Sequence, residues 1–199
     1  FTVVPLHIFE PRYRKMINDS IAMKRRIGVA HTKRLLAPSE FQFVTKESEV
    51  LNTDQETYEA HSIFSAGFAE LIDTLQDGRM LVEIVMDSRY EIIEELQQSP
   101  YKIALCRPYA DELSVDGSAA QLRIELDQTL LELPDPKLDA LQTYIGSPKW
   151  KAMSTLEYSY AIYSLVIFDP DILQKVLELQ SPMARINFML QALGQGSLL

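Results

Sequence analysis

The stretch VPLHIFEPRYRKMI, residues 4–17, joins two kinds of secondary structure. It begins with a strand-like apolar run from Val4 to Phe9 and continues, after Glu10-Pro11, as a basic stretch. An acidic residue followed by proline is typical of a helix start, because proline has no N–H to lose there and its φ is already helical. A helix over residues 11–22 is therefore predicted, with Glu10 as its N-cap. One apolar stripe at helical spacing supports it: Tyr13, Met16, Ile17 and Ile21.

An acidic or hydroxyl residue before proline recurs at Asp135-Pro136, Asp169-Pro170 and Ser181-Pro182, and it predicts further helix starts in the second half. Residues 150–168 are apolar nearly all round, which predicts one central, buried helix. Three more amphipathic helices are indicated by apolar residues that share a face: Leu122, Leu126, Leu130 and Leu133; Leu138, Leu141 and Ile145; Met183, Ile186, Leu190 and Leu193, the last ended by Gly194.

The first half is typical of strands instead. Residues 62–75 and 80–86 flank QDGR, and Asp-Gly between two β-rich runs is a strong hairpin signal. Val82, Ile84 and Met86 form the more apolar face of the second strand, and residues 26–32, 89–93 and 101–108 extend the β pattern. Residues 35–60 show no period and are expected to be irregular. Strands followed by helices predict an α+β protein with subdomains 1–112 and 113–199, separated by a linker at 111–117.

Charge is unevenly distributed along the 199 residues. The net charge is −9, yet residues 1–36 hold eight Lys or Arg and two acidic residues, so this part carries +6 and the rest −15. An acidic chain disfavours nonspecific binding of nucleic acid. No apolar run reaches the length of a membrane span and no signal-peptide pattern is present. With a single cysteine, Cys106, the chain suits the cytoplasm, and oligomeric assembly is left open.

Motifs for chemistry are missing from the sequence. It contains no P-loop, no G-x-S-x-G, no H-E-x-x-H and no dinucleotide fingerprint. His7, His31 and His61 lie far apart, and His7 and His31 would approach only if their strands pair. Cys106 stands in an apolar strand without an evident base, which favours a core residue over a nucleophile. We therefore predict no catalytic residue, no metal site and no cofactor.

At PLHIFEPRYRKMI the sequence resembles the N-terminal, substrate-binding domain of Lon proteases, whose signature has the form P-L-x-I-F-E-P-R-Y-x-x-M. The residues that match it are Pro5, Leu6, Ile8, Phe9, Glu10, Pro11, Arg12, Tyr13 and Met16. A second block, residues 65–92, is similar to the family through Gly67, Ala69, Ile72, Asp77-Gly78, Arg89 and Tyr90. The closing helix matches at Pro182, Arg185 and Ile186. The glycine that the family often has before the arginine is replaced here by Asp87 or Ser88.

The resemblance implies a PUA-like twisted β-pseudobarrel followed by a helical bundle. It assigns structural roles to the signature residues Pro5, Phe9, Glu10, Pro11, Arg12, Tyr13 and Arg89. It also implies a stand-alone or excised polypeptide-recognition module, not a peptidase, since neither an ATPase nor a Ser–Lys protease part appears in these 199 residues. The expected partners are unfolded or apolar polypeptide segments, held at the sheet edge or between the barrel and the bundle, since β-edge addition and apolar grooves are the usual physical routes.

Two groups of residues are candidates for peptide binding. The opening helix offers the basic side chains Arg12, Arg14 and Lys15 for acidic segments, and the helical half offers Tyr144, Trp150 and Tyr163. For most of these aromatic residues, a place in the core is the favoured explanation. Two alternative functions stay open: a PUA-like protein that binds a small ligand or RNA, and a hydrolase that works without ATP.

Overall fold

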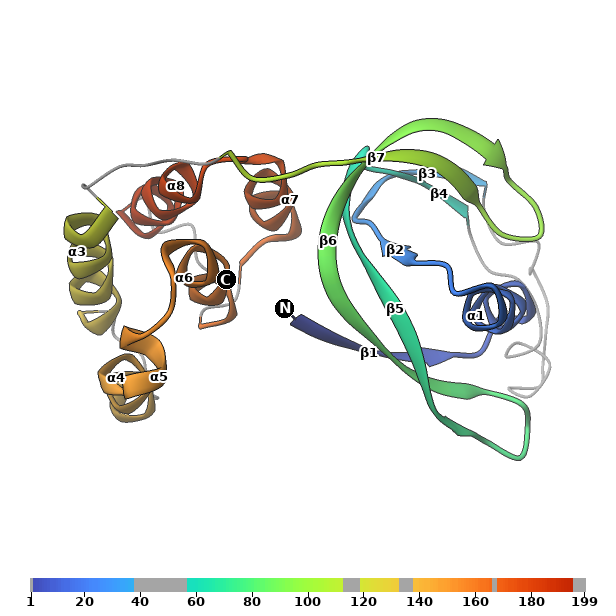
Figure 1. The fold of residues 1–199 in the computed structure, drawn as a ribbon, viewed down its shortest axis with the longest axis horizontal. Helices are drawn as coiled ribbons and strands as arrows, with labels where there is room; N and C mark the ends of the chain where they lie inside the picture. Colours follow the sequence, from blue (N-terminus) through green and yellow to red (C-terminus); the bar gives the residue numbers. More distant parts are fainter. Residues whose placement is uncertain (1, 38–56, 113–118, 133–137, 166–167, 195–199) are drawn as a thin grey trace. The chain divides into compact units, whose positions relative to one another are not determined.

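The computed structural model describes residues 2–37, 57–112, 119–132, 138–165 and 168–194. The chain forms two compact units, residues 1–110 and 111–199. Strands dominate the first unit and helices make up the second (Figure 1), which confirms the predicted α+β class. The PUA-like topology and the independence of subdomains 1–112 and 113–199 stay predictions.

The first unit is built on an antiparallel sheet with the order β1-β6-β5-β2, and β7 also pairs with β6. Because β5 takes one edge of β6 over residues 80–91, β1 and β7 occupy the other edge in succession. A separate ladder joins β3 and β4. The strands are β1 (Thr2–Ile8), β2 (Ile27–Val29), β3 (Thr32–Ala37), β4 (Thr57–Ala60), β5 (Ile63–Thr74), β6 (Met80–Gln97) and β7 (Ile103–Pro108).

The hairpin that the Asp-Gly signal predicts is confirmed. β5 and β6 pair across a turn in which Gly78 has a φ of +85°, a conformation that glycine adopts without steric cost. Val82, Ile84 and Met86 are buried, as the strand pattern indicates. The prediction of an irregular stretch over residues 35–60 is wrong at both ends, because β3 and β4 pair there; residues 38–56 lie outside the described ranges.

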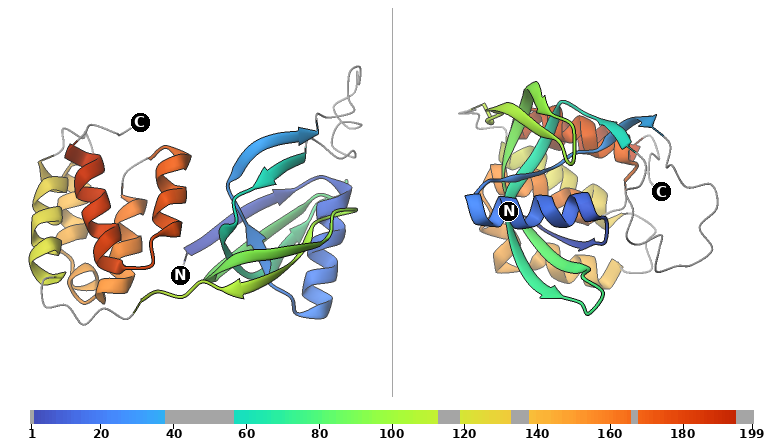
Figure 2. Two further views of the ribbon diagram at one scale, coloured as in Figure 1. Left: turned by 90° about the horizontal axis from the view of Figure 1, so that it is seen from above. Right: turned by 90° about the vertical axis from the view of Figure 1, so that its right-hand side faces the viewer.

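Helix α1 (Pro11–Met23) follows β1 after two residues and lies within the curve of the strands (Figures 1 and 2). Ile17 is fully buried in a core that it shares with Ile27, Val82 and Ile84. The predicted stripe is wrong at its end: Ile21 is 41% exposed, and Ser20 is buried in its place. The buried side of the helix is therefore rotated slightly from the side that its apolar residues mark.

The start of α1 is as predicted, with Pro11 in its first turn, but the side chain of Glu10 does not cap it. Instead, Oε2 of Glu10 accepts a hydrogen bond from Nε of Arg12 at 2.8 Å and forms an ion pair with the same guanidinium, whose Nη2 is also 2.8 Å away. The ion pair with Arg12 thus takes the place of the predicted cap. At the other helix starts the cap is made: Asp169 accepts from the amide of Asp171, and Ser181 accepts from that of Ala184. Asp135-Pro136 lies outside the described residues.

The second unit packs its helices around an apolar core that includes Leu126, Trp150, Tyr158 and Ile186. Its elements are α3 (Ala119–Leu131), α4 (Leu138–Gly146), α5 (Pro148–Lys151), α6 (Thr155–Ala161), the 3-10 helix η1 (Ile162–Ser164), α7 (Pro170–Glu178) and α8 (Pro182–Gly194). No helix in the described ranges has the length and apolarity needed to cross a bilayer.

The single long helix predicted over residues 150–168 is wrong. A capping box starts a new helix inside it: Ser154 Oγ accepts from the amide of Glu157, whose carboxylate accepts from the amide of Ser154. The buried character that the composition indicates is nevertheless present, since Trp150, Tyr158 and Ile162 are at most 1% exposed. In this segment, apolar residues on every side therefore indicate burial. They do not indicate one continuous helix.

Candidate functional site

The first unit contains a half-open groove between α1 and the strands, with a volume of about 630 Å³. Side chains from α1 and from every strand except β1 line it, so it forms only when the sheet curves around the helix (Figure 1). A groove of this size lies within the range of sites that take small ligands or several side chains of a peptide.

The floor of the groove is apolar and aromatic. Ile27 and Phe64 are buried there, and the rings of Phe64 and Tyr90 lie 6.4 Å apart in a stacked arrangement. Two large apolar side chains at the lining are exposed, Met23 at 58% and Tyr58 at 40%. Exposed apolar side chains around a concave apolar floor are typical of a site for an apolar ligand.

Charged groups at the lining are mostly tied to one another. Lys102 pairs with Glu95 at 3.2 Å, and Arg26 donates to Asp87 through both Nε and Nη2. Arg25 also lines the groove; its charge helps to lower the pKa of Asp19, but its side chain makes no ion pair or hydrogen bond among the described residues. Arg25 is thus the cation of the groove that is available to a ligand.

Several titrating groups at the lining have shifted pKa values, among them Asp19 and Cys106. Hydrogen bonds from Lys15 and from the Tyr101 hydroxyl, at 2.8 and 2.6 Å, lower the pKa of Asp19 below its usual 3.8. Burial raises the pKa of the Cys106 thiol above 9.0. Asp19 therefore stays charged down to low pH, and Cys106 is a protonated thiol at neutral pH.

Of the basic candidates on α1, only Arg12 lines the groove, and its guanidinium pairs with Glu10. Arg14 lies against the β5–β6 turn, since its Nη1 would be 2.8 Å from a Cβ placed on Gly78. Lys15 is exposed and pairs with Asp19. The three side chains do not converge on one site. Arg89, the remaining signature cation, is buried, with its guanidinium 5.1 Å from the centre of the Tyr109 ring.

The aromatic candidates belong to the second unit. Trp150 is 1% exposed and its indole N–H donates to Asp127 at 3.1 Å, while the Tyr163 hydroxyl donates to the carbonyl of Arg185 at 2.7 Å. Both placements agree with the core explanation, so we do not propose these two residues as contacts for a peptide. Tyr144 is 37% exposed with its ring 5.3 Å from that of Trp150, and its role in binding stays a prediction.

His7 and His31 would approach only if their strands paired, and these strands do not pair. β1, which carries His7, pairs with β6, while His31 precedes β3 and its carbonyl accepts from the amide of His61. No group of three or more metal-ligating side chains occurs within the described ranges. Sequence reasoning missed Arg25, Met23 and Phe64 as groove residues, because nothing in their spacing indicates that a helix end and separate strands meet.

Comparisons with known proteins agree with the resemblance at the signature. The family model of the ATP-dependent protease La (LON) substrate-binding domain matches residues 2–195. Lon protease 1 of Herpetosiphon aurantiacus is 25% identical over 201 residues, which cover 96% of this chain and 23% of that protein. The chain thus spans less than a quarter of that relative's length.

Two solved structures have a similar fold. A Lon N-terminal domain protein from Xanthomonas campestris superposes with a TM-score of 0.59 at 13% identity, covering 96% of this chain and 89% of that one. The N-terminal domain of the Lon protease of the Mycobacterium avium complex gives a TM-score of 0.62 at 12% identity, with coverages of 97% and 90%. At these identities the likeness shows the fold alone.

Proposed function

Because the chain belongs to the family of Lon substrate-binding domains, we propose that it recognises segments of other polypeptides without cleaving them. The observation that carries the proposal is the groove between α1 and the strands, with its apolar floor and exposed apolar rim. A cytoplasmic location is part of the proposal and is supported by the single cysteine.

The ligand that fits the groove is an extended segment with apolar side chains. Phe64 and Ile27 offer a rigid floor, and Met16 and Met23 offer flexible thioether side chains that adapt to ligands of different shape. Such adaptable surfaces are typical of proteins that bind many sequences. The groove therefore selects for apolar character more than for a particular sequence.

Arg25 adds a preference for a carboxylate next to the apolar residues. Its charge is exposed, so the attraction is weakened by salt. A single groove of this kind binds with a dissociation constant of about 1 μM or weaker. Several copies presented together would raise the apparent affinity by avidity.

A small ligand or RNA is the second candidate. The carboxylates of Asp19 and Glu95 line the groove, but each pairs with a lysine, so the charges at the lining do not decide against an anionic ligand. The apolar floor and the exposed apolar side chains at the lining favour the polypeptide.

Catalysis at the groove is not part of the proposal. A nucleophilic thiol requires a lowered pKa and a base in reach, whereas burial raises the pKa of Cys106. The Sγ of Cys106 lies 3.7 Å from the carbonyl of Ala104, which is a contact within its own strand.

Cys106 provides the experiment, since it is the sole cysteine and lines the groove. The rate of its alkylation would be measured with and without an unfolded, labelled protein, and again with a peptide that combines apolar residues and a carboxylate. We expect the ligand to slow alkylation several-fold, and Arg25→Glu to weaken this protection more at low salt than at high salt. Lys24→Glu is the matched control, because Lys24 is exposed, adjacent and outside the lining.

Equal alkylation rates at saturating ligand would overturn the proposed groove. Protection by an oligonucleotide or by a small metabolite, with none by unfolded protein, would favour the second candidate instead.

A further inference from the structure

A second surface lies on the face of the sheet that points away from α1, on β1, β6 and β5. Direct cross-strand partners share a face, so Val3, Val85 and Phe68 lie in one row and His7 with Leu81 in another. Val3 is 49% exposed, Phe68 41% and Leu81 36%. We call this the outer face. Its exposed apolar side chains come from three strands; Asp73 stands directly opposite Leu81, and the guanidinium of Arg26 lies 4.5 Å from the centre of the Phe68 ring.

Between these two rows, Glu70 on β5 stands directly opposite Glu83 on β6. Directly opposed side chains in an antiparallel pair have Cβ atoms about 5 Å apart, and like charges at that distance destabilise the sheet. Neither carboxylate has an ion-pair or hydrogen-bond partner within the described ranges. Asp87, farther along β6, is by contrast neutralised by Arg26.

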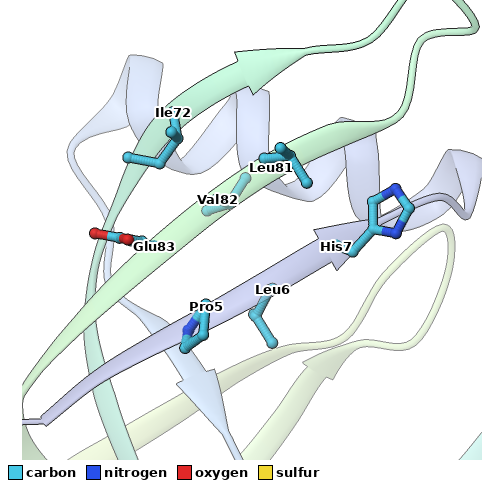
Figure 3. A pocket seen from close by; sticks show the side chains of 7 residues that line it. All are labelled: Pro5, Leu6, His7, Ile72, Leu81, Val82 and Glu83. Carbon is cyan, nitrogen blue, oxygen red and sulfur yellow. The ribbon is translucent and has the colours of Figure 1, made fainter.

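Next to Glu83 the outer face is hollowed. The hollow has a volume of about 330 Å³ and is lined by residues of β1, β5 and β6, which Figure 3 shows along the three strands. Ile72, at the register shift between Leu71 and Asp73, is 57% exposed at its border. One apolar side chain of a partner fits this hollow with a cation beside it.

We propose that the outer face docks a segment of a partner protein that presents Lys or Arg between apolar side chains. Charge complementarity selects this occupant. A cation placed between Glu70 and Glu83 relieves their repulsion, while the apolar neighbours of that cation cover Val3 and Leu81. A second copy in a symmetric contact is disfavoured, because it would bring two such carboxylate pairs together.

This surface is distinct from the groove, and the two have opposite charge preferences. The groove offers the unpaired Arg25, whereas the outer face offers the unpaired Glu70 and Glu83. If binding at one surface is disproved, the proposal for the other surface still stands, so the two proposals are tested independently.

The test uses the full chain and a fluorescent peptide as long as β1, seven residues, in which Lys alternates with Val. Binding is followed by fluorescence anisotropy at low salt. We expect Glu70→Gln/Glu83→Gln to weaken binding about three- to tenfold, the range for losing two exposed charge pairs. The same variant should melt at an equal or higher temperature, because the repulsion is removed. Loss of binding then cannot reflect unfolding.

Glu125→Gln/Glu132→Gln is the matched control, since it makes the same charge change at exposed positions of the second unit. A peptide that alternates Glu with Val should not bind the outer face. Equal affinity of the Lys peptide for the protein and for Glu70→Gln/Glu83→Gln would overturn the proposal. A dimer in sedimentation that Ile72→Ser dissociates would also overturn it, because the occupant would then be a second copy.

Discussion

The guanidinium of Arg185 is fully buried and donates a hydrogen bond to the carboxylate of Asp111, at the opposite end of the second unit in sequence. The same guanidinium donates to Ser159 and to the carbonyl of Leu179, and it lies 4.1 Å from the centre of the Tyr160 ring. Through the Arg185 side chain, α8 is thus hydrogen-bonded to the first residue of its unit, to α6 and to the end of α7.

Removal of the Asp111 carboxylate should therefore lower the stability of the folded protein. Asp111→Ala leaves the buried charge of Arg185 without its counterion, and we expect the free energy of unfolding to fall by about 3–5 kcal/mol. Urea denaturation followed by circular dichroism measures the change. Glu125→Ala, at an exposed position of α3, serves as the control and should change the stability by less than about 0.5 kcal/mol. A similar small change for Asp111→Ala would contradict a stabilising ion pair.

Glu10 should contribute through Arg12 and not through the helix amides. We expect Glu10→Ala to lower the free energy of unfolding by about 1.5–3 kcal/mol, the range for hydrogen bonds to charged groups. Glu10→Asp shortens the side chain and should recover only part of this loss. Asn18→Ala, on an exposed position of the same helix, is the control. Full recovery in Glu10→Asp would instead indicate that capping of the helix matters.

Gly67 should not tolerate even a methyl group. A Cβ at this position would lie 1.9 Å from the carbonyl oxygen of Val85 on the paired strand. Since a backbone atom cannot move aside cheaply, Gly67→Ala should destabilise the protein by about 1–3 kcal/mol or more. Gly146→Ala is the control, because nothing lies within 4 Å of its added Cβ. Thermal melting of both variants provides the measurement.

The carboxylate of Asp19 should contribute to stability in a pH-dependent way. Its folded pKa is lowered below 3.8, so its contribution is present above that pH and is lost as the pH falls through the folded pKa. Tyr101→Phe removes one of the two hydrogen bonds that lower the pKa, and the pKa of Asp19 should rise toward 3.8. Carbon-13 NMR titration of the carboxyl group measures it, with Tyr144→Phe as the control. An unchanged titration would exclude the Tyr101 contact in solution.

Local patterns of the sequence determined the elements whose signals lie within a few neighbouring residues. Glu10-Pro11 marks the start of α1, Asp77-Gly78 marks the hairpin, and the alternation of Val82, Ile84 and Met86 marks the buried side of β6. In each case steric limits on the backbone, or the two-residue period of a strand, act at short range and do not depend on the rest of the chain. The signature around Glu10 also identified the family, because its residues are contiguous.

The tertiary structure alone decided which distant residues meet. Arg25 and Phe64 come to one groove only because the sheet curves around α1, and Glu70 faces Glu83 only because of the register in which β5 and β6 pair. Asp111 meets Arg185 because α8 packs back onto the beginning of its unit. Each of these contacts depends on strand register or on helix packing, which are set by the burial of the whole core and leave no periodic trace in the sequence.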